Sequence, residues 1–254
     1  DSGKILYDIN GHTNFHSLNT SRNHVEFLKH PSSFEEYRKK FAKVWSHLLY
    51  GDSYLTNLTI KTSVSMQCSL KDFFKMAGAR YKLWLDEEFL VFSPETFVRI
   101  KDGKIFSFPM KGTIHADTPD AENEILNDPK ELAEHVTIVD LIRNDLSAVA
   151  DNVRVTRFRY IEKINTMQKN LLQVSSEICG DLPEDYFSRL GDILVKLLPA
   201  GSVSGAPKCK TLEIIREAEG ERRGYYTGVV GLFDGETFDS GVMIRYLERS
   251  NNEL

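Results

Sequence analysis

Two Asp-Gly pairs, Asp102-Gly103 and Asp234-Gly235, each separate two runs rich in apolar and β-branched residues. Asp-Gly favours a two-residue turn with both residues at positive φ, the turn that joins neighbouring antiparallel strands. We therefore predict one hairpin over residues 96–109 and another with strands at 225–233 and 237–248. Hairpin connections of this kind argue against a doubly wound parallel sheet.

Period-2 alternation and apolar runs predict further strands at 53–66, 81–85, 88–93, 153–165 and 171–178. Apolar residues at helical spacing predict helices after Ser33 (through Phe34, Tyr37, Phe41, Val44 and Leu48), at 70–77, at 121–146, from Leu182 to before Pro199, and at 207–218. The first 30 residues are polar and weakly patterned. The mixture predicts an α+β class, and the lack of repeats or linkers predicts one domain over residues 1–254.

The composition, with 41% apolar and 27% charged residues, is typical of a globular protein. The net charge is −5 without a basic cluster, so we expect no nucleic-acid partner. No apolar run approaches ~18 residues and no signal peptide is evident, so we expect no membrane association. Cys68, Cys179 and Cys209 lack disulfide or metal spacing, which predicts a cytoplasmic location. Since the first residue is Asp1, we expect the start of the protein to lie upstream.

Lys111 precedes Gly112 and Thr113 at the end of the first predicted hairpin. Gly112 allows close backbone approach, and Thr113 offers a hydroxyl to an oxyanion. If Phe106 and Phe108 are core residues, Lys111 lies near the sheet interior, where desolvation lowers the pKa of an amine and makes it a nucleophile. The competing interpretation is a solvated lysine at a strand end.

Three glutamates are candidates for acid chemistry or metal binding. Glu95 precedes the first hairpin, where it is either a general acid or an ordinary turn residue. Glu131 and Glu134 are three positions apart, so their carboxylates share one helix face. Paired carboxylates suit a hard cation such as Mg²⁺, although a solvated acidic face has the same pattern.

Residues 201–208 read Gly-Ser-Val-Ser-Gly-Ala-Pro-Lys and lead into a predicted helix. Glycines, hydroxyls and a helix N-terminus together form an anion-binding cradle. The segment is not a P-loop, because the Gly-Lys-Ser/Thr ending is missing. Glycine-rich turns are common, so this segment alone does not define a site.

In this order, the segments resemble those of the chorismate-utilising enzymes, a family that includes anthranilate synthase component I, aminodeoxychorismate synthase component I, isochorismate synthase and salicylate synthase. The resemblance covers about residues 50–250. It rests on Pro-Met-Lys-Gly-Thr (109–113), Asp-Leu-Ile-Arg-Asn-Asp (140–145), the 201–208 segment, Arg-Gly-Tyr-Tyr-Thr-Gly-Val-Val-Gly (223–231) and Ile244-Arg245. It implies an α+β fold of two packed, mostly antiparallel β-sheets flanked by helices, forming a single chorismate-binding catalytic domain.

The resemblance also implies roles for the candidate residues. Lys111 stands where aminodeoxychorismate synthases have lysine and anthranilate synthases have alanine. The resemblance to the aminodeoxychorismate synthases implies amination of chorismate at C4 with ammonia, through a covalent lysine adduct at C2. This reaction lies on the route to p-aminobenzoate and folate. Glu95 matches the general acid for the departing hydroxyl, and Glu131 and Glu134 match glutamates that hold Mg²⁺. The matched substrate-binding positions are Gly112, Thr113, Ser202, Tyr226 and Arg245.

Three departures from the family pattern are visible. Leu55 replaces the usual Gln or Lys and cannot activate water, which argues against isochorismate and salicylate synthase chemistry. Leu172 or Gln173 stands where the family often has histidine. Family members continue past the Arg245 hairpin with a second acidic pair for Mg²⁺, so we expect a C-terminal segment beyond the 254 residues.

Two other functions stay open. Anthranilate synthase component I would give anthranilate and pyruvate, and an inactive chorismate-binding subunit would give no product. None of the cysteines lies in the Gly-x-Cys-x-Gly elbow of a glutamine amidotransferase. We therefore predict a separate glutamine amidotransferase subunit that supplies ammonia. The long N-terminal region that carries tryptophan feedback in larger relatives is reduced here, so we expect no such regulation.

Overall fold

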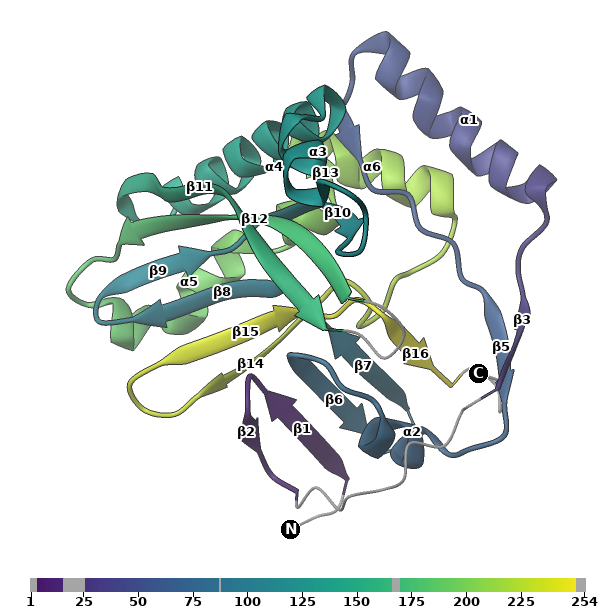
Figure 1. Cartoon of the computed structure of the whole chain (residues 1–254), viewed down its shortest axis with the longest axis horizontal. Coiled ribbons are helices and arrows are strands. Elements are labelled where there is room, and N and C mark those ends of the chain that lie inside the picture. Colours follow the sequence, from purple (N-terminus) through teal and green to yellow (C-terminus); the bar gives the residue numbers. More distant parts are fainter. Residues whose placement is uncertain (1–3, 16–25, 87, 166–169, 250–254) are drawn as a thin grey trace. The chain divides into compact units, whose positions relative to one another are not determined.

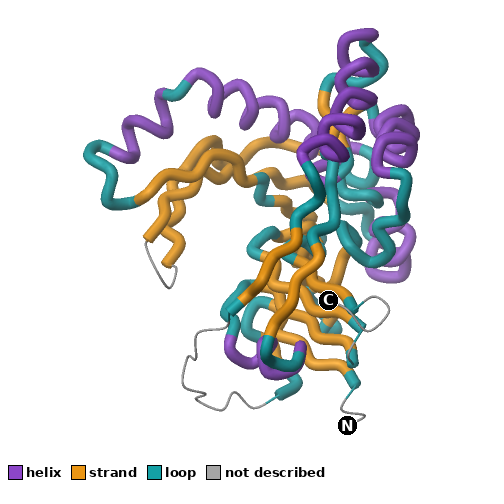
Figure 2. Tube along the Cα trace, turned by 90° about the vertical axis from the view of Figure 1, so that its right-hand side faces the viewer, coloured by secondary structure: helices purple, strands orange, loops and turns teal. Residues whose placement is uncertain are grey.

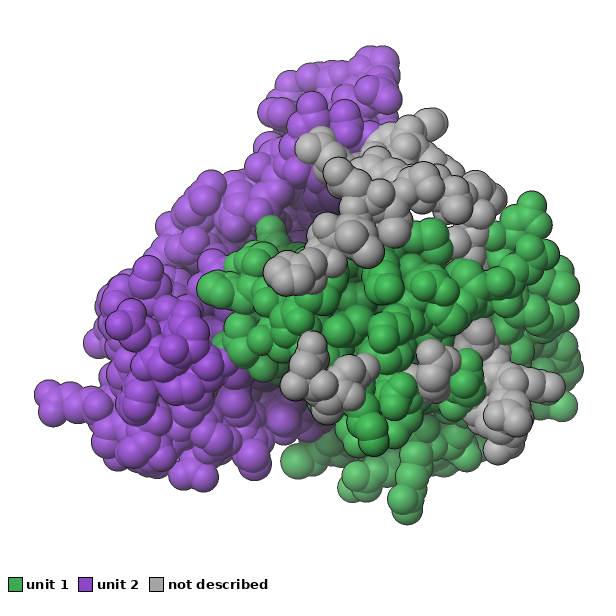
Figure 3. All heavy atoms as spheres, turned by 90° about the horizontal axis from the view of Figure 1, so that it is seen from below, with its two compact units in different colours: residues 1–94, 203–232, 240–254 green, residues 95–202, 233–239 purple. Residues whose placement is uncertain are grey.

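The computed structural model describes residues 4–15, 26–86, 88–165 and 170–249. The chain forms two compact units, which Figure 3 separates by colour. Unit 1 comprises residues 1–94, 203–232 and 240–254, and unit 2 comprises residues 95–202 and 233–239. Each unit is therefore assembled from segments that are distant in sequence. The single domain expected over residues 1–254 stays a prediction.

Unit 1 contains a five-stranded antiparallel sheet with the strand order β16-β7-β6-β1-β2 (Figure 1). Its strands are β1 (Ile5–Ile9), β2 (His12–Thr13), β6 (Tyr81–Leu85), β7 (Phe89–Ser93) and β16 (Tyr246–Glu248). Helix α2 (Leu70–Met76) covers this sheet with Leu70 and Phe74, which pack on Trp84 and Leu90. The weakly patterned N-terminal residues thus contribute to this sheet two strands, β1 and β2, that were not predicted from the sequence.

Helices α1 (Phe34–Tyr50) and α6 (Lys208–Glu219) pack together in unit 1 through Val44, Ile214 and Ala218. The predicted start of α1 is confirmed, because Ser33 and Glu36 form a reciprocal capping box. The predicted apolar face is only partly buried. Val44 is 3% exposed, whereas Phe34, Tyr37 and Phe41 are 42–75% exposed and line up on the outer face of the helix.

The continuous strand predicted at 53–66 is wrong. The structure has two short strands there, β4 (Leu55–Thr56) paired with β13 (Gly205–Ala206), and β5 (Ser63–Met66) paired with β3 (Phe27–His30). Between them, the Asn57 carbonyl accepts a hydrogen bond from Arg223 and the Thr59 N–H donates to Glu219. The side chains of Arg223 and Glu219 therefore satisfy backbone groups that would pair with a neighbouring strand in a continuous β-strand.

Unit 2 contains most of a seven-stranded sheet with the order β10-β12-β9-β8-β15-β14, in which β11 also pairs with β12. The strands of this sheet are β8 (Thr96–Lys101), β9 (Lys104–Ser107), β10 (Met110–His115), β11 (Asp151–Asn165), β12 (Asn170–Asp181), β14 (Val229–Phe233) and β15 (Phe238–Val242), and unit 2 holds β8 to β12 entirely. Asp102 and Gly103 have φ values of 51° and 70°, which confirms the first predicted turn. The predicted strand at 237–248 is wrong, because β15 ends at Val242 and β16 joins the other sheet.

The single helix predicted at 121–146 is two helices, α3 (Ala121–Asn127) and α4 (Pro129–Ser147). Asp128 caps α4 by accepting from the Glu131 N–H at 2.9 Å, and Pro129 has no N–H with which to continue α3. Helix α4 packs along β10, β11 and β12, as the long helix above the curved strands in Figure 2 shows. This packing brings the acidic face of α4 to strand β10.

The remaining helical segments are η1 (Tyr186–Arg189), α5 (Leu190–Leu197) and η2 (Gly201–Val203). The helix predicted from Leu182 therefore becomes α-helical only at Leu190, after a 3-10 turn. The predicted α+β class with mostly antiparallel sheets is confirmed. Within the described residues, no helix has the length and apolar character needed to cross a membrane.

Candidate active site

Lys111 and Gly112 lie at an irregularity in β10. Met110 pairs with Ser175 and Thr113 pairs with Gln173, so the register against β12 shifts across the two residues between them. Gly112 has φ of 91°, and a Cβ there would lie 3.0 Å from Oε2 of Glu131. A residue with a side chain would be strained at this φ and would press on Glu131. The local shape of β10 therefore requires glycine next to Lys111.

The Lys111 side chain lies beside the acidic face of α4. Its Nζ is 3.3 Å from Oε2 of Glu134, and the side chain is 48% exposed. This exposure agrees with the alternative of a solvated lysine at a strand end and not with that of a desolvated nucleophile. Phe106 and Phe108 are only half-buried, whereas Ile105 and Ser107 carry the buried face of β9.

Glu95 is partly buried at the start of unit 2, and its carboxyl accepts a hydrogen bond from Ser202. Burial raises the pKa of Glu95 above its ordinary value, while the Ser202 hydrogen bond and the positive charge of Lys111 act in the opposite direction. A carboxyl with a raised pKa keeps its proton to higher pH and suits a general acid. The structure therefore brings Glu95, Ser202 and Lys111 into one electrostatic environment.

Glu131 and Glu134 share one face of α4, as predicted. Glu131 lies next to Gly112, and Glu134 contacts Lys111 and, at 3.6 Å, the exposed Lys130. Carboxylate oxygens are the donors that Mg²⁺ prefers, so the chemistry of this pair fits such an ion. Over the described ranges, no cluster of three or more His, Cys, Asp or Glu side chains could hold a metal ion. The magnesium site stays a prediction.

His135, which the sequence analysis left without a role, is fully buried directly after Glu134. Its Nε2 lies 2.7 Å from Oγ of Ser176, and its Nδ1 lies 3.4 Å from the Lys111 carbonyl oxygen. Burial lowers the pKa of His135, and the charge of Arg159 acts in the same direction. The spacing from Glu131 could have indicated it, because residues i and i+4 share a helix face.

Thr113 is exposed on β10, opposite Gln173 on β12. At the position where the resemblance implies histidine, Leu172 is 8% exposed and belongs to the core. Gln173 is partly exposed and is therefore the more accessible of the two.

The other predicted substrate residues lie in unit 1. Tyr226 occupies a tight turn in which its N–H donates to the Arg223 carbonyl, and its ring centroid lies 5.8 Å from that of Tyr246. Burial raises the pKa of Tyr226. Arg245 is exposed at φ of 51°, between β15 and β16, and its carbonyl accepts from the Phe92 N–H at 3.2 Å.

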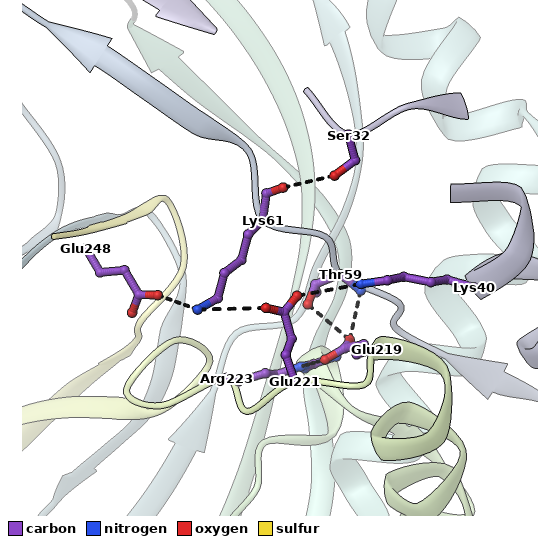
Figure 4. A network of polar contacts seen from close by, with 8 residues as sticks. All are labelled: Ser32, Lys40, Thr59, Lys61, Glu219, Glu221, Arg223 and Glu248. Carbon is purple, nitrogen blue, oxygen red and sulfur yellow. Dashed lines mark hydrogen bonds and ion pairs between the residues drawn. The ribbon is translucent and has the colours of Figure 1, made fainter. Parts of the chain in front are cut away.

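A buried ion pair fixes the turn that carries Tyr226. Arg223 donates to both carboxylate oxygens of Glu219, at 2.6 and 3.0 Å (Figure 4). The same guanidinium donates to the carbonyls of Val203 and Asn57, at 2.8 and 2.6 Å. One side chain therefore joins the end of α6 to two other backbone segments of unit 1.

Gly205 occupies a position that no larger residue could take. Its φ is 134°, and a Cβ there would lie 2.0 Å from the Leu55 carbonyl oxygen. Close pairing of β13 with β4 explains this glycine without any ligand. The anion-binding role expected for residues 201–208 therefore stays a prediction.

Comparison with known proteins identifies the family of the chain. The family described as chorismate binding enzyme matches residues 7–254. An uncharacterized PabA-like protein from Haemophilus influenzae is 51% identical over 250 residues, covering 98% of this chain and 76% of that protein. Aminodeoxychorismate synthase component 1 from Bacillus subtilis is 33% identical over 217 residues, covering 80% of this chain and 45% of that enzyme.

Solved structures agree with this placement. Anthranilate synthase component I from Streptococcus pneumoniae TIGR4 has a TM-score of 0.71 and 26% identity, covering 90% of this chain and 52% of that chain. MenF, the menaquinone-specific isochorismate synthase from Escherichia coli, has a TM-score of 0.65 at 17% identity, covering 87% and 53%, and so supports the fold alone. Because the family match spans nearly the whole chain, the protein belongs to the chorismate binding enzymes.

Proposed function

We propose that the protein aminates chorismate at C4 with ammonia to give 4-amino-4-deoxychorismate. The observation that carries the proposal is the placement of Lys111. Its amine lies 3.3 Å from Glu134 on the acidic helix face, and its charge acts on the carboxyl of Glu95. The proposed nucleophile Lys111, the proposed general acid Glu95 and the carboxylates of Glu131 and Glu134 all belong to unit 2, which supports this proposal.

The proposed reaction has two displacement steps. After the Lys111 ammonium has lost a proton to solvent, its free amine forms a bond to C2 of chorismate, the ring double bonds shift, and the C4–O bond breaks. Glu95 gives its proton to the departing hydroxyl, which leaves as water. Ammonia then bonds to C4, the C2–N bond to Lys111 breaks, and the amine is regenerated. Because the Lys111 amine is attached to the protein beside the bound substrate, its effective concentration is higher than that of an amine free in solution.

Other residues are proposed to hold the substrate and a cation. Glu131 and Glu134 would bind Mg²⁺, which supplies positive charge for a substrate carboxylate. Gly112, Thr113, Ser202, Tyr226 and Arg245 are proposed substrate contacts, the roles that the family resemblance implies. An arginine offers paired donors that match a carboxylate.

A separate glutamine amidotransferase subunit is the proposed source of ammonia, and the cytoplasm is the proposed location. The names of the PabA-like relatives support the idea of such a partner. Glutamine-dependent product formation on mixing the two purified proteins would support this pairing. Strict dependence on added ammonium in the mixture would count against it.

The test of the proposed function is product analysis after incubation with chorismate, Mg²⁺ and an ammonium salt. We expect 4-amino-4-deoxychorismate without pyruvate from the wild type, and loss of this product in Lys111→Ala. Lys111→Arg is the matched control, since it keeps the positive charge beside Glu134 but lacks a nucleophilic amine. Wild-type rates in either variant would rule out the covalent route.

Anthranilate synthesis is the second candidate, because several relatives are anthranilate synthases, including the Pseudomonas aeruginosa component 1 at 32% identity over 87% of this chain. The same assay separates the two functions. Anthranilate and pyruvate from the wild type would favour this second reaction. Since anthranilate synthases have alanine at the position of Lys111, Lys111→Ala should still form both products if the protein is an anthranilate synthase.

A further inference from the structure

A chain of hydrogen bonds that passes through the buried side chains of Ser176 and His135 reaches the backbone of Lys111. The N–H of Arg159 donates to Oγ of Ser176 at 2.9 Å, and this Oγ lies 2.7 Å from Nε2 of His135. The opposite ring nitrogen, Nδ1, lies 3.4 Å from the carbonyl oxygen of Lys111. Ser176 and His135 are both 0% exposed, so the bond between them is buried, whereas the bonds at the Arg159 and Lys111 ends of the chain are part-buried.

The Arg159 N–H can only donate, and this fixes which atoms donate in the rest of the chain. Ser176 Oγ accepts the Arg159 N–H, and its own hydroxyl proton can then be donated to Nε2 of His135. A proton on Nε2 alone would leave the Nδ1 lone pair facing the lone pairs of the Lys111 carbonyl. The arrangement that satisfies every atom has the proton on Nδ1, donated to Lys111.

The receiving carbonyl lies where β10 departs from regular pairing. Lys111 falls between the Met110↔Ser175 and Thr113↔Gln173 pairs of the β10–β12 ladder. A residue at such an irregularity lacks the regular ladder that would fix its orientation. The His135 ring supplies an anchor from α4 in its place.

Two consecutive residues of α4, Glu134 and His135, thus contact the side chain and the backbone of Lys111. Glu134 contacts the side-chain ammonium at 3.3 Å, and His135 contacts the main-chain carbonyl. We propose that His135 is a positioning residue, whose Nδ1–H bond to the Lys111 carbonyl aims the lysine amine at its substrate. This role rests on the proposed function of Lys111 as the nucleophile.

Two amide variants separate this role from simple core filling. The side-chain nitrogen of asparagine lies near the place of Nδ1, whereas the longer glutamine reaches the place of Nε2. His135→Asn is therefore expected to keep the bond to Lys111, and His135→Gln to keep only the bond to Ser176. Both remove the aromatic ring, so they form a matched pair.

In the chorismate and ammonia assay, we expect kcat of His135→Gln to fall about 10–10²-fold, since small misplacements of a reacting group have effects of this size. We expect KM for chorismate to change little, and His135→Asn to recover most of kcat. Equal kcat values in the two variants would overturn the positioning role. Thermal unfolding of both variants checks that each is folded.

A second measurement does not depend on activity or on a folded variant. NMR of the wild-type protein labelled with ¹⁵N-histidine is expected to show the His135 proton on Nδ1, and a proton on Nε2 alone would overturn the proposal. The two proposals fail separately. Retained product in Lys111→Ala would remove the proposed role of Lys111 as nucleophile while leaving the hydrogen bond in place. Equal kcat values in the two amide variants, together with an inactive Lys111→Ala, would remove only the positioning role of His135.

Discussion

Nζ of Lys111 lies 3.3 Å from Oε2 of Glu134, so the proposed nucleophile pairs with one of the two proposed magnesium ligands. Substitution of Glu134 by Gln removes a negatively charged oxygen that accepts from Lys111 and is proposed to bind Mg²⁺. We expect Glu134→Gln to raise the Mg²⁺ concentration for half-maximal activity by about tenfold or more, and to lower kcat. Titration of the ammonia-dependent activity with Mg²⁺ measures both effects.

Lys130→Gln is the control for this substitution. Lys130 also pairs with Glu134, at 3.6 Å, but its side chain is 77% exposed. Exposed pairs contribute about 0–1 kcal/mol, so the Mg²⁺ titration should stay close to that of the wild type. An unshifted titration in Glu134→Gln itself would remove this acid from the metal site.

The raised pKa of Glu95 predicts how activity depends on pH. A general acid works only while protonated, so kcat should fall as pH rises through the pKa that burial has raised. Glu95→Gln should lose about 10²–10⁴-fold in kcat and this alkaline limb with it. Because the Ser202 hydrogen bond lowers the pKa of Glu95, Ser202→Ala should move the limb to higher pH. If kcat of Ser202→Ala falls at the same pH as kcat of the wild type, a group other than Glu95 controls this fall.

Local signals in the sequence were enough for several elements of the fold. The Asp102-Gly103 turn and the Ser33 capping box each depend on side chains within a few residues, so the pattern alone identifies them. The strand expected at 53–66 failed for the opposite reason. Its central residues bond to Glu219 and Arg223, which lie more than a hundred positions away, and no local pattern reports such partners.

The candidate residues divide in the same way. The spacing of Glu131 and Glu134 placed both on one helix face, and the structure adds Lys111 to that face. The sequence left open whether Lys111 is desolvated or solvated, because its exposure depends on which face of β9 is buried and on the register shift beside Gly112. The spacing from Glu131 could have indicated His135, but its hydrogen bond to Ser176 could not be predicted, because Ser176 lies 41 positions away on a strand.

The hydrogen bond between His47 and Asp52 should make the free energy of unfolding depend on pH. Its Nδ1 lies 2.6 Å from Oδ2 of Asp52, and this hydrogen bond is the main cause that raises the pKa of His47 above its ordinary value. The folded protein therefore binds this proton more tightly than the unfolded chain does. The stabilisation is complete below the unfolded pKa, about 6.5, and is lost as pH rises through the raised folded pKa.

Urea unfolding of the wild type and His47→Gln across this pH range measures the effect. The difference in unfolding free energy between the two proteins should shrink as pH rises, and Asp52→Asn should remove the same dependence. A constant difference from acidic to alkaline pH would show that the histidine contributes by packing rather than by charge.

The buried pair of Arg223 with Glu219 should be much more sensitive to substitution than an exposed pair. The two side chains are 16% and 2% exposed, so Arg223→Ala leaves a buried carboxylate without its cation. The expected loss is about 3–5 kcal/mol of unfolding free energy, measured by urea denaturation. Arg38→Ala is the control, because Arg38 pairs with Glu35 where the side chains are 65% and 53% exposed, and it should cost about 0–1 kcal/mol.

Glu219→Gln separates charge from hydrogen bonding at the same position. The amide oxygen can still accept from the N–H and hydroxyl of Thr59, which lie 2.9 and 3.0 Å from Oε1 of Glu219. Removal of the carboxylate also leaves Arg223 with its bonds to the Val203 and Asn57 carbonyls. The loss should therefore be smaller than in Arg223→Ala, because three backbone segments stay joined. Equal losses in the two variants would show that the ion pair, rather than the connection between segments, stabilises this part of unit 1.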